Sequence, residues 1–90
     1  MAYADTTSIT VTTAWTQVGT SPIGFFNDTR FQMEVRRQAS GSPAASAKGV
    51  PLDEGKRYEN SAIGEIVFVR LIGDVRNAAP SAALLVDQWG

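Results

Sequence analysis

Hydrophobic and polar residues alternate along several short stretches of the chain, which is the pattern of half-buried β-strands. The clearest stretch covers residues 31–36, where apolar and polar side chains fall on opposite faces: Phe31, Met33 and Val35 against Gln32, Glu34 and Arg36. Residues 8–12 alternate in the same way, with Ile9 and Val11 between hydroxyl-bearing neighbours. Both segments therefore predict strands that turn one face to a core and the other to solvent.

Shorter apolar segments at 15–18, 23–26 and 50–52 are separated by turn-forming residues and predict further strands. Pro51 places the last of them at a sheet edge, because proline cannot donate to a ladder. Residues 53–55 read as a turn leading to Tyr58. No segment has a sustained helical period. With about seven short strands, the sequence predicts an all-β fold, a small antiparallel β-sandwich or barrel. Residues 1–90 form one domain, with a flexible N-terminal arm at 1–7.

Two late segments, 65–72 and 82–86, are apolar on both faces. Such strands are buried on both sides, so one side faces the core and the other needs a cover. A neighbouring subunit and a loop of the same chain are equally good candidates for that cover. The first alternative predicts a homo-oligomer, most simply a trimer. The interface candidates on these strands, with a tryptophan near the end of the sequence, are Ile66, Phe68, Ile72, Leu85 and Trp89.

Residues 38–49 are rich in small side chains, and a loop of this length in a small domain is functional or disordered. Ser42 could cap a single helical turn here, and an extended loop fits equally well. We expect this loop, through Pro43, Ala44 and Ala45, or the N-terminal arm, to contact a partner.

The composition argues against several kinds of chemistry. The chain has no Cys and no His, which removes catalytic triads, disulfides and most transition-metal sites. We therefore expect no catalytic residue, no metal and no cofactor, and a protein that is not an enzyme. The net charge of −1 argues against nucleic-acid binding. The apolar run 66–69 is too short to span a membrane, and no signal peptide is visible. The glycosylation sequon at 27–29 carries no weight without secretion.

Aromatic side chains offer one other function, a sugar-binding β-sandwich module. Four residues could stack on a sugar, although in small β-domains such side chains more often belong to a core or an interface: Tyr3, Trp15, Tyr58 and Trp89. Exposed, coplanar aromatic rings would mark the sugar-binding alternative.

The order of features from Phe31 onward resembles short β-proteins encoded among the head and tail genes of tailed bacteriophages. The features are the alternating strand 31–36, the small-residue loop 42–46, the turn region 49–55 and the apolar strands 67–70 and 83–86. The resemblance covers about two-thirds of the chain and leaves the N-terminal third unmatched. It implies a virion structural protein without catalytic residues.

Within that group, the resemblance favours a capsid decoration, or cement, protein. Such proteins sit as trimers at three-fold positions on the capsid surface and clamp neighbouring subunits of the major capsid protein. The expected partner is then the major capsid protein, and the expected location is the virion, after synthesis in the host cytoplasm. A tail, baseplate or fibre component is the nearest alternative.

Overall fold

The structure is a computed structural model that describes residues 5–73 and 76–88. Over these residues the chain forms eight strands and no helix. The strands are β1 (Asp5–Val11), β2 (Thr16–Thr20), β3 (Ile23–Phe26), β4 (Met33–Gln38), β5 (Val50–Leu52), β6 (Arg57–Asn60), β7 (Ile66–Leu71) and β8 (Ala82–Gln88). They confirm the predicted all-β fold.

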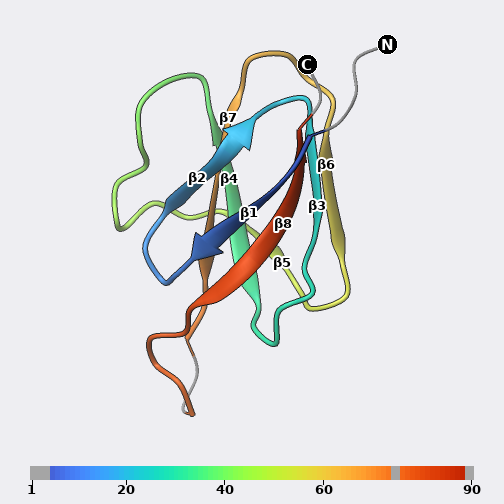
Figure 1. Cartoon of the computed structure of the whole chain (residues 1–90). Coiled ribbons are helices and arrows are strands. Elements are labelled where there is room, and N and C mark those ends of the chain that lie inside the picture. Colours follow the sequence, from blue (N-terminus) through green and yellow to red (C-terminus); the bar gives the residue numbers. More distant parts are fainter. Residues whose placement is uncertain (1–4, 74–75, 89–90) are drawn as a thin grey trace.

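Two four-stranded antiparallel sheets pack face to face (Figure 1). Sheet A has the strand order β1-β8-β3-β6, and sheet B has the order β2-β7-β4-β5. Most neighbours in each sheet are distant in sequence, because the chain crosses repeatedly from one sheet to the other. The fold is thus a β-sandwich, the first of the two architectures that the strand count predicted.

The core lies between the sheets and is built from alternate residues of the strands. In β7 every second side chain points inward, and Val67, Val69 and Leu71 are at most 1% exposed. Strands β3 and β8 contribute in the same way from sheet A, and the remaining buried apolar residues complete one cluster: Val11, Val18, Ile23, Phe25, Met33, Val35, Leu52, Leu84 and Val86. The period-two alternation seen in the sequence therefore selects the core correctly.

Three local features differ from the prediction or decide between its alternatives. Strand β6 was not predicted, because its inward-facing residues Tyr58 and Asn60 are polar and do not mark an apolar face. Residues 5–7, which the sequence assigned to a flexible N-terminal arm, belong to β1 and pair with residues 86–88 of β8, and the rest of that arm lies outside the described residues. The loop 39–49 is extended apart from one turn, in which the N–H of Ala47 donates to the carbonyl of Ala44 at 2.9 Å.

A buried asparagine organises one end of the sandwich. Asn27 is 0% exposed. Its Nδ2 donates to the carbonyls of Phe31 and Leu52, each at 2.9 Å, and its Oδ1 accepts from the N–H and hydroxyl of Thr29 at 3.0 and 2.6 Å. The side-chain amide joins the turn 27–31 to Leu52 and is buried between them, so the sequon at 27–29 is not accessible to a glycosylating enzyme in the folded chain.

Candidate functional site

The outer face of sheet B, which is turned away from the core, is covered by the chain's own loop 39–49. Two arginines of the face hold the loop through its main chain. Arg70 Nη1 donates to the carbonyl of Ala45 at 2.8 Å, and Arg36 Nη1 donates to the carbonyl of Lys48 at 2.7 Å. Figure 1 shows the loop, green to yellow-green, beside β2 and β4. The loop is therefore part of the packed structure of sheet B.

A partly buried ion pair fixes the centre of this covered face. Nε and Nη2 of Arg70 lie 2.8 and 2.7 Å from Oε1 of Glu34, and the two side chains are 20% and 17% exposed. Glu34 also accepts from the N–H of Gly49 at 3.1 Å, while the Arg70 guanidinium lies 4.5 Å from the ring centre of Trp15. Only glycine fits at position 49, because a Cβ there would lie 2.6 Å from the carbonyl oxygen of Val35.

The cover explains where three of the interface candidates lie. Phe68 is 3% exposed but does not belong to the core cluster between the sheets. Its register partner is Arg36, whose side chain points to the outer face, so Phe68 is buried on that face by its own chain. Ile66 and Ile72 lie on the same side and are half-buried. The chain itself thus buries the second apolar side of β7 at Phe68.

The remaining candidates separate into loop, strand and unplaced residues. In the loop, Pro43 is half-buried, whereas Ala44 and Ala45 are exposed at its outer surface. Leu85 of β8 is 56% exposed. Trp89 lies outside the described residues. The structure therefore brings the loop candidates onto sheet B and leaves Leu85 on the opposite sheet.

The surroundings of Glu34 set its pKa below the ordinary value of 4.5. Burial raises this pKa, but the hydrogen bond from Gly49, the hydrogen bond and charge of Arg70 and the charge of Lys48 together lower it further than burial raises it. A carboxyl group whose pKa is lowered by folding stabilises the fold above its unfolded pKa. That contribution is lost as the pH falls through the folded pKa.

We expect the free energy of unfolding to fall in acid partly through this group. Urea denaturation of the wild-type chain and Glu34→Gln should show a smaller loss for the variant between about pH 7 and about pH 3, since its amide does not titrate. Glu59→Gln is the matched control, because Glu59 is an exposed carboxylate paired with Arg57. The control should keep the wild-type acid response. Equal pH dependence of wild type and Glu34→Gln would contradict the assignment.

The outer face of sheet A has a different composition and no covering loop among the described residues. Strand register places its side chains in rows that cross the sheet. One row contains Ser8 of β1 and Leu85 of β8, and the β3–β8 ladder ends one residue short of this row, at Phe25 and Val86. Phe26 pairs in turn with Arg57 of β6. An adjacent row contains Thr6, Asp87, Gly24 and Glu59.

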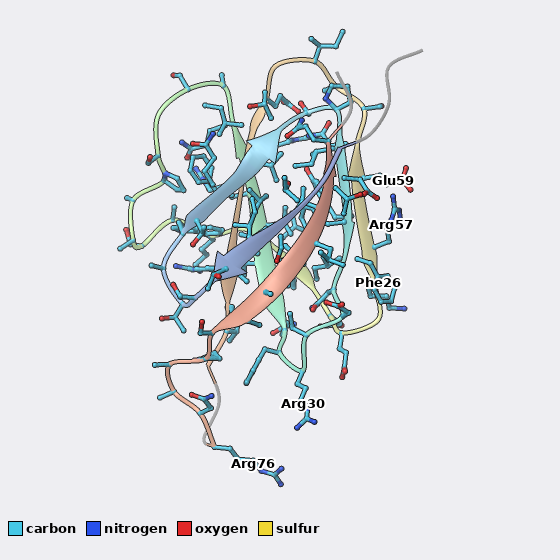
Figure 2. The ribbon with its side chains drawn as sticks, in the orientation of Figure 1. Phe26, Arg30, Arg57, Glu59 and Arg76 are labelled. Atoms are coloured by element: carbon cyan, nitrogen blue, oxygen red, sulfur yellow. The ribbon has the colours of Figure 1, made fainter. Side chains whose placement is uncertain are left out.

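Leu85 and Phe26, on the adjacent strands β8 and β3, are the large apolar side chains exposed on this face, and we call them its apolar centre. They are 56% and 46% exposed, which is unusual for large apolar side chains on adjacent strands. Figure 2 shows Phe26 on the same side of the molecule as Arg57 and Glu59, which point away from the sandwich. Their mutual ion pair, at 2.7 Å, flanks the apolar centre. We call the surface formed by Ser8, Thr10, Leu85, Phe26 and Arg57 the sheet A face.

Sequence reasoning identified Leu85 but not Phe26. The alternation within 23–26 was a usable signal, because side chains of a strand point alternately to its two faces. Ile23 and Phe25 face the core, at 0% and 1% exposure, so Phe26 faces outward. These two apolar side chains lie on adjacent strands because β3 pairs with β8, a strand far away in sequence. No local pattern contains that pairing.

Three other features bear on the described part of the chain: a metal site, a membrane span and a sugar-binding platform. It contains no group of three His, Cys, Asp or Glu residues that could hold a metal ion. No helix within it is long and apolar enough to cross a membrane. Trp15 is half-buried against Arg70, and Tyr58 is stacked on the buried Phe25 at 5.1 Å between ring centres. These two rings thus serve packing and do not form the exposed coplanar platform expected of a sugar site.

Comparison with protein families, characterised proteins and solved structures finds no match to this chain.

Proposed function

We propose that this chain is a virion structural protein of the capsid decoration type, and that it binds the major capsid protein through the sheet A face. One observation carries the proposal: the two sheets differ in what covers them. Loop 39–49 covers sheet B, whereas sheet A presents Leu85 and Phe26 to solvent at the centre of a polar surface. An apolar centre with a polar rim is the usual anatomy of a protein-binding surface.

The composition of the face indicates the kind of contact it makes. Hydroxyl groups of Ser8 and Thr10 surround the apolar centre on one side, and the ion pair of Arg57 and Glu59 bounds the other. Because opposite charges pair within the chain, the docked contact is mainly apolar and hydrogen-bonded. Binding should then depend weakly on salt, since screening acts on exposed, unpaired charges.

The proposal includes self-association, which now depends on one of the two strands that suggested it. The trimer was inferred from the second apolar sides of β7 and β8, and the chain itself buries Phe68 on β7. Leu85 on β8 remains as the exposed apolar residue that a second copy could cover. Sedimentation of the isolated wild-type chain tests this part, and a monomer at tens of micromolar restricts any trimer to the capsid surface.

Leu85→Asp should weaken binding to capsid particles by about 10-fold or more, because it places a charge at the desolvated centre of the interface. The matched control is Ile63→Asp, which changes an apolar side chain that is 90% exposed in the turn between β6 and β7. Particle occupancy is measured by quantitative mass spectrometry. Thermal unfolding of both variants checks that the fold is intact. Full occupancy by Leu85→Asp would exclude the sheet A face as the docking surface.

The cement function itself is tested by heating particles with and without the bound protein. A protein that binds the mature lattice selectively stabilises it by mass action, so genome release should require a higher temperature when the protein is present. Identical release temperatures at full occupancy would contradict a cement function. A copy number of a few to a few dozen per particle would instead favour a tail, baseplate or fibre component.

A further inference from the structure

Strand β4 extends beyond its outer partner in sheet B. Strand β5 pairs with β4 only at Met33, Glu34 and Val35, whereas β4 continues to Gln38. Within residues 5–73 and 76–88, no strand pairs with residues 36–38 on the side where β5 ends. Sheet B therefore has an open edge that begins where β5 stops.

The course of the preceding loop explains why β5 is so short. The N–H of Gly49 donates to Glu34, and the carbonyl of Lys48 accepts from Arg36. Both partners lie on the outer face of sheet B, so the chain before Val50 leaves the plane of the sheet to cover that face. The position beside residues 36–38 is left open as a consequence.

The open edge presents the main-chain groups of Arg37. The N–H of Ile72 donates to the carbonyl of Gln32 at 2.8 Å, so even-numbered residues of this strand turn their main-chain groups toward β7. Odd-numbered residues turn theirs toward β5, which is consistent with Pro51, a residue without an N–H, lying opposite Glu34. By the same period of two, the N–H and C=O of Arg37 point into the open position.

A hollow of about 530 Å³ occupies this position. Its lining residues come from the end of β4, the start of β5 with the loop before it, and β6: Val35, Arg36, Arg37, Lys48, Gly49, Val50 and Tyr58. Val50, which is 69% exposed, and Tyr58 supply an apolar wall on the side between the sheets. Three cationic side chains and no carboxylate line the hollow, and two acids that contact its arginines or lie on its strand β4, Glu65 and Glu34, already pair with Arg37 and Arg70.

We propose that this open edge binds an extended acidic segment of a partner protein, which adds to sheet B as a strand in line with β5. The residue opposite Arg37 exchanges two main-chain hydrogen bonds with it and turns an apolar side chain toward Val50 and Tyr58. Its two neighbours point the other way, because side chains alternate along a strand, and place carboxylates near Arg36 and Lys48. The recognised pattern is acidic, apolar, acidic. This site is separate from the sheet A face and does not depend on it.

Backbone amide exchange and peptide titration followed by NMR test the proposal directly. In the unliganded chain the Arg37 amide should exchange at least about 10-fold faster than the Val35 amide, whose partner is β5. A capped peptide with the core Asp-Val-Asp should slow exchange at Arg37 by about 10-fold at saturation and shift the Arg37 and Tyr58 signals. The same peptide N-methylated at its valine should not bind, because it lacks the donor that Arg37 needs.

Charge selectivity is tested with a Lys-Val-Lys peptide and two variants of the protein. The basic peptide should not bind. Lys48→Glu should weaken binding of the Asp-Val-Asp peptide by about 5-fold or more. Lys56→Glu is the control, because Lys56 is exposed in the turn before β6 and lies outside the hollow, and it should change the peptide affinity by less than about 2-fold. Equal binding of acidic and basic peptides, or binding of the N-methylated peptide, would overturn the proposal. Displacement of the peptide by millimolar inorganic phosphate would also overturn it, in favour of a simple anion site. Slow exchange at Arg37 without peptide would show that the edge is not open.

Discussion

Asn27→Ala is expected to lower the free energy of unfolding by about 3 kcal/mol, a large fraction of the stability of a small domain. The substitution leaves the carbonyls of Phe31 and Leu52 and the N–H of Thr29 without the partner that satisfies them in the folded chain. Each buried polar group that loses its partner costs about 1–3 kcal/mol, although the Thr29 hydroxyl can still serve the Phe31 carbonyl. The total is therefore below the sum of three separate losses.

Urea denaturation of the wild-type chain and the variant measures this effect. Asp28→Ala is the control, because Asp28 is the exposed neighbour in the same turn and its substitution should change stability by less than about 0.5 kcal/mol. Asn27→Asp gives a second comparison, since it keeps an acceptor for Thr29 and removes the donor to Phe31 and Leu52. A loss below about 1 kcal/mol for Asn27→Ala would show that water replaces the missing contacts.

The sandwich was predictable because its strands show their buried face in the sequence. The alternation of residues 31–36 names the inward side chains from the sequence, whereas residues 66–71 are apolar on both faces and indicate only a strand that is buried on both sides. Strand β6 gave no such signal: its inward-facing Asn60 is 7% exposed and is satisfied by Tyr58 and Glu65, so a polar residue occupies a core-facing position. Residues 57–60 therefore carry no apolar signal that predicts a strand.

The candidate surfaces were less predictable, because they depend on contacts between distant segments. The doubly apolar character of β7 correctly indicated a covered second side, but the sequence left open whether a subunit or a loop supplied the cover. The answer lies in hydrogen bonds from Arg36 and Arg70 to main-chain carbonyls of the loop, and main-chain acceptors have no sequence signature. The open edge at Arg37 likewise follows from where β5 stops pairing.

The two surfaces suit different kinds of partner. The sheet A face is broad, with apolar side chains at its centre and paired charges at one margin, and it fits the folded surface of another protein. The open edge of β4 offers main-chain hydrogen bonds and cationic side chains in a narrow hollow, and it fits a single extended segment. A decoration protein that used both would hold a folded capsid subunit with one sheet and a flexible arm with the other.

Phe68→Ala is expected to lower the free energy of unfolding by about 3–5 kcal/mol, as for other large-to-small changes at buried aromatic residues. The ring is 3% exposed on the outer face of sheet B, so its removal leaves a cavity on that face. Arg36→Ala should lower the free energy of unfolding by less than Phe68→Ala does. Its effect should still exceed that of truncating a solvated strand residue, because Arg36 also donates to the carbonyl of Lys48.

Leu85→Ala is the comparison that separates folding from docking. Leu85 is 56% exposed, so truncating it should change the free energy of unfolding by about 0.5 kcal/mol or less. The same substitution should reduce particle occupancy, because it removes the apolar centre of the sheet A face. Urea denaturation and particle binding of both variants give four measurements. If Phe68→Ala unfolds at the wild-type urea concentration but fails to bind particles, then Phe68 contacts the partner directly and the loop does not form its permanent cover.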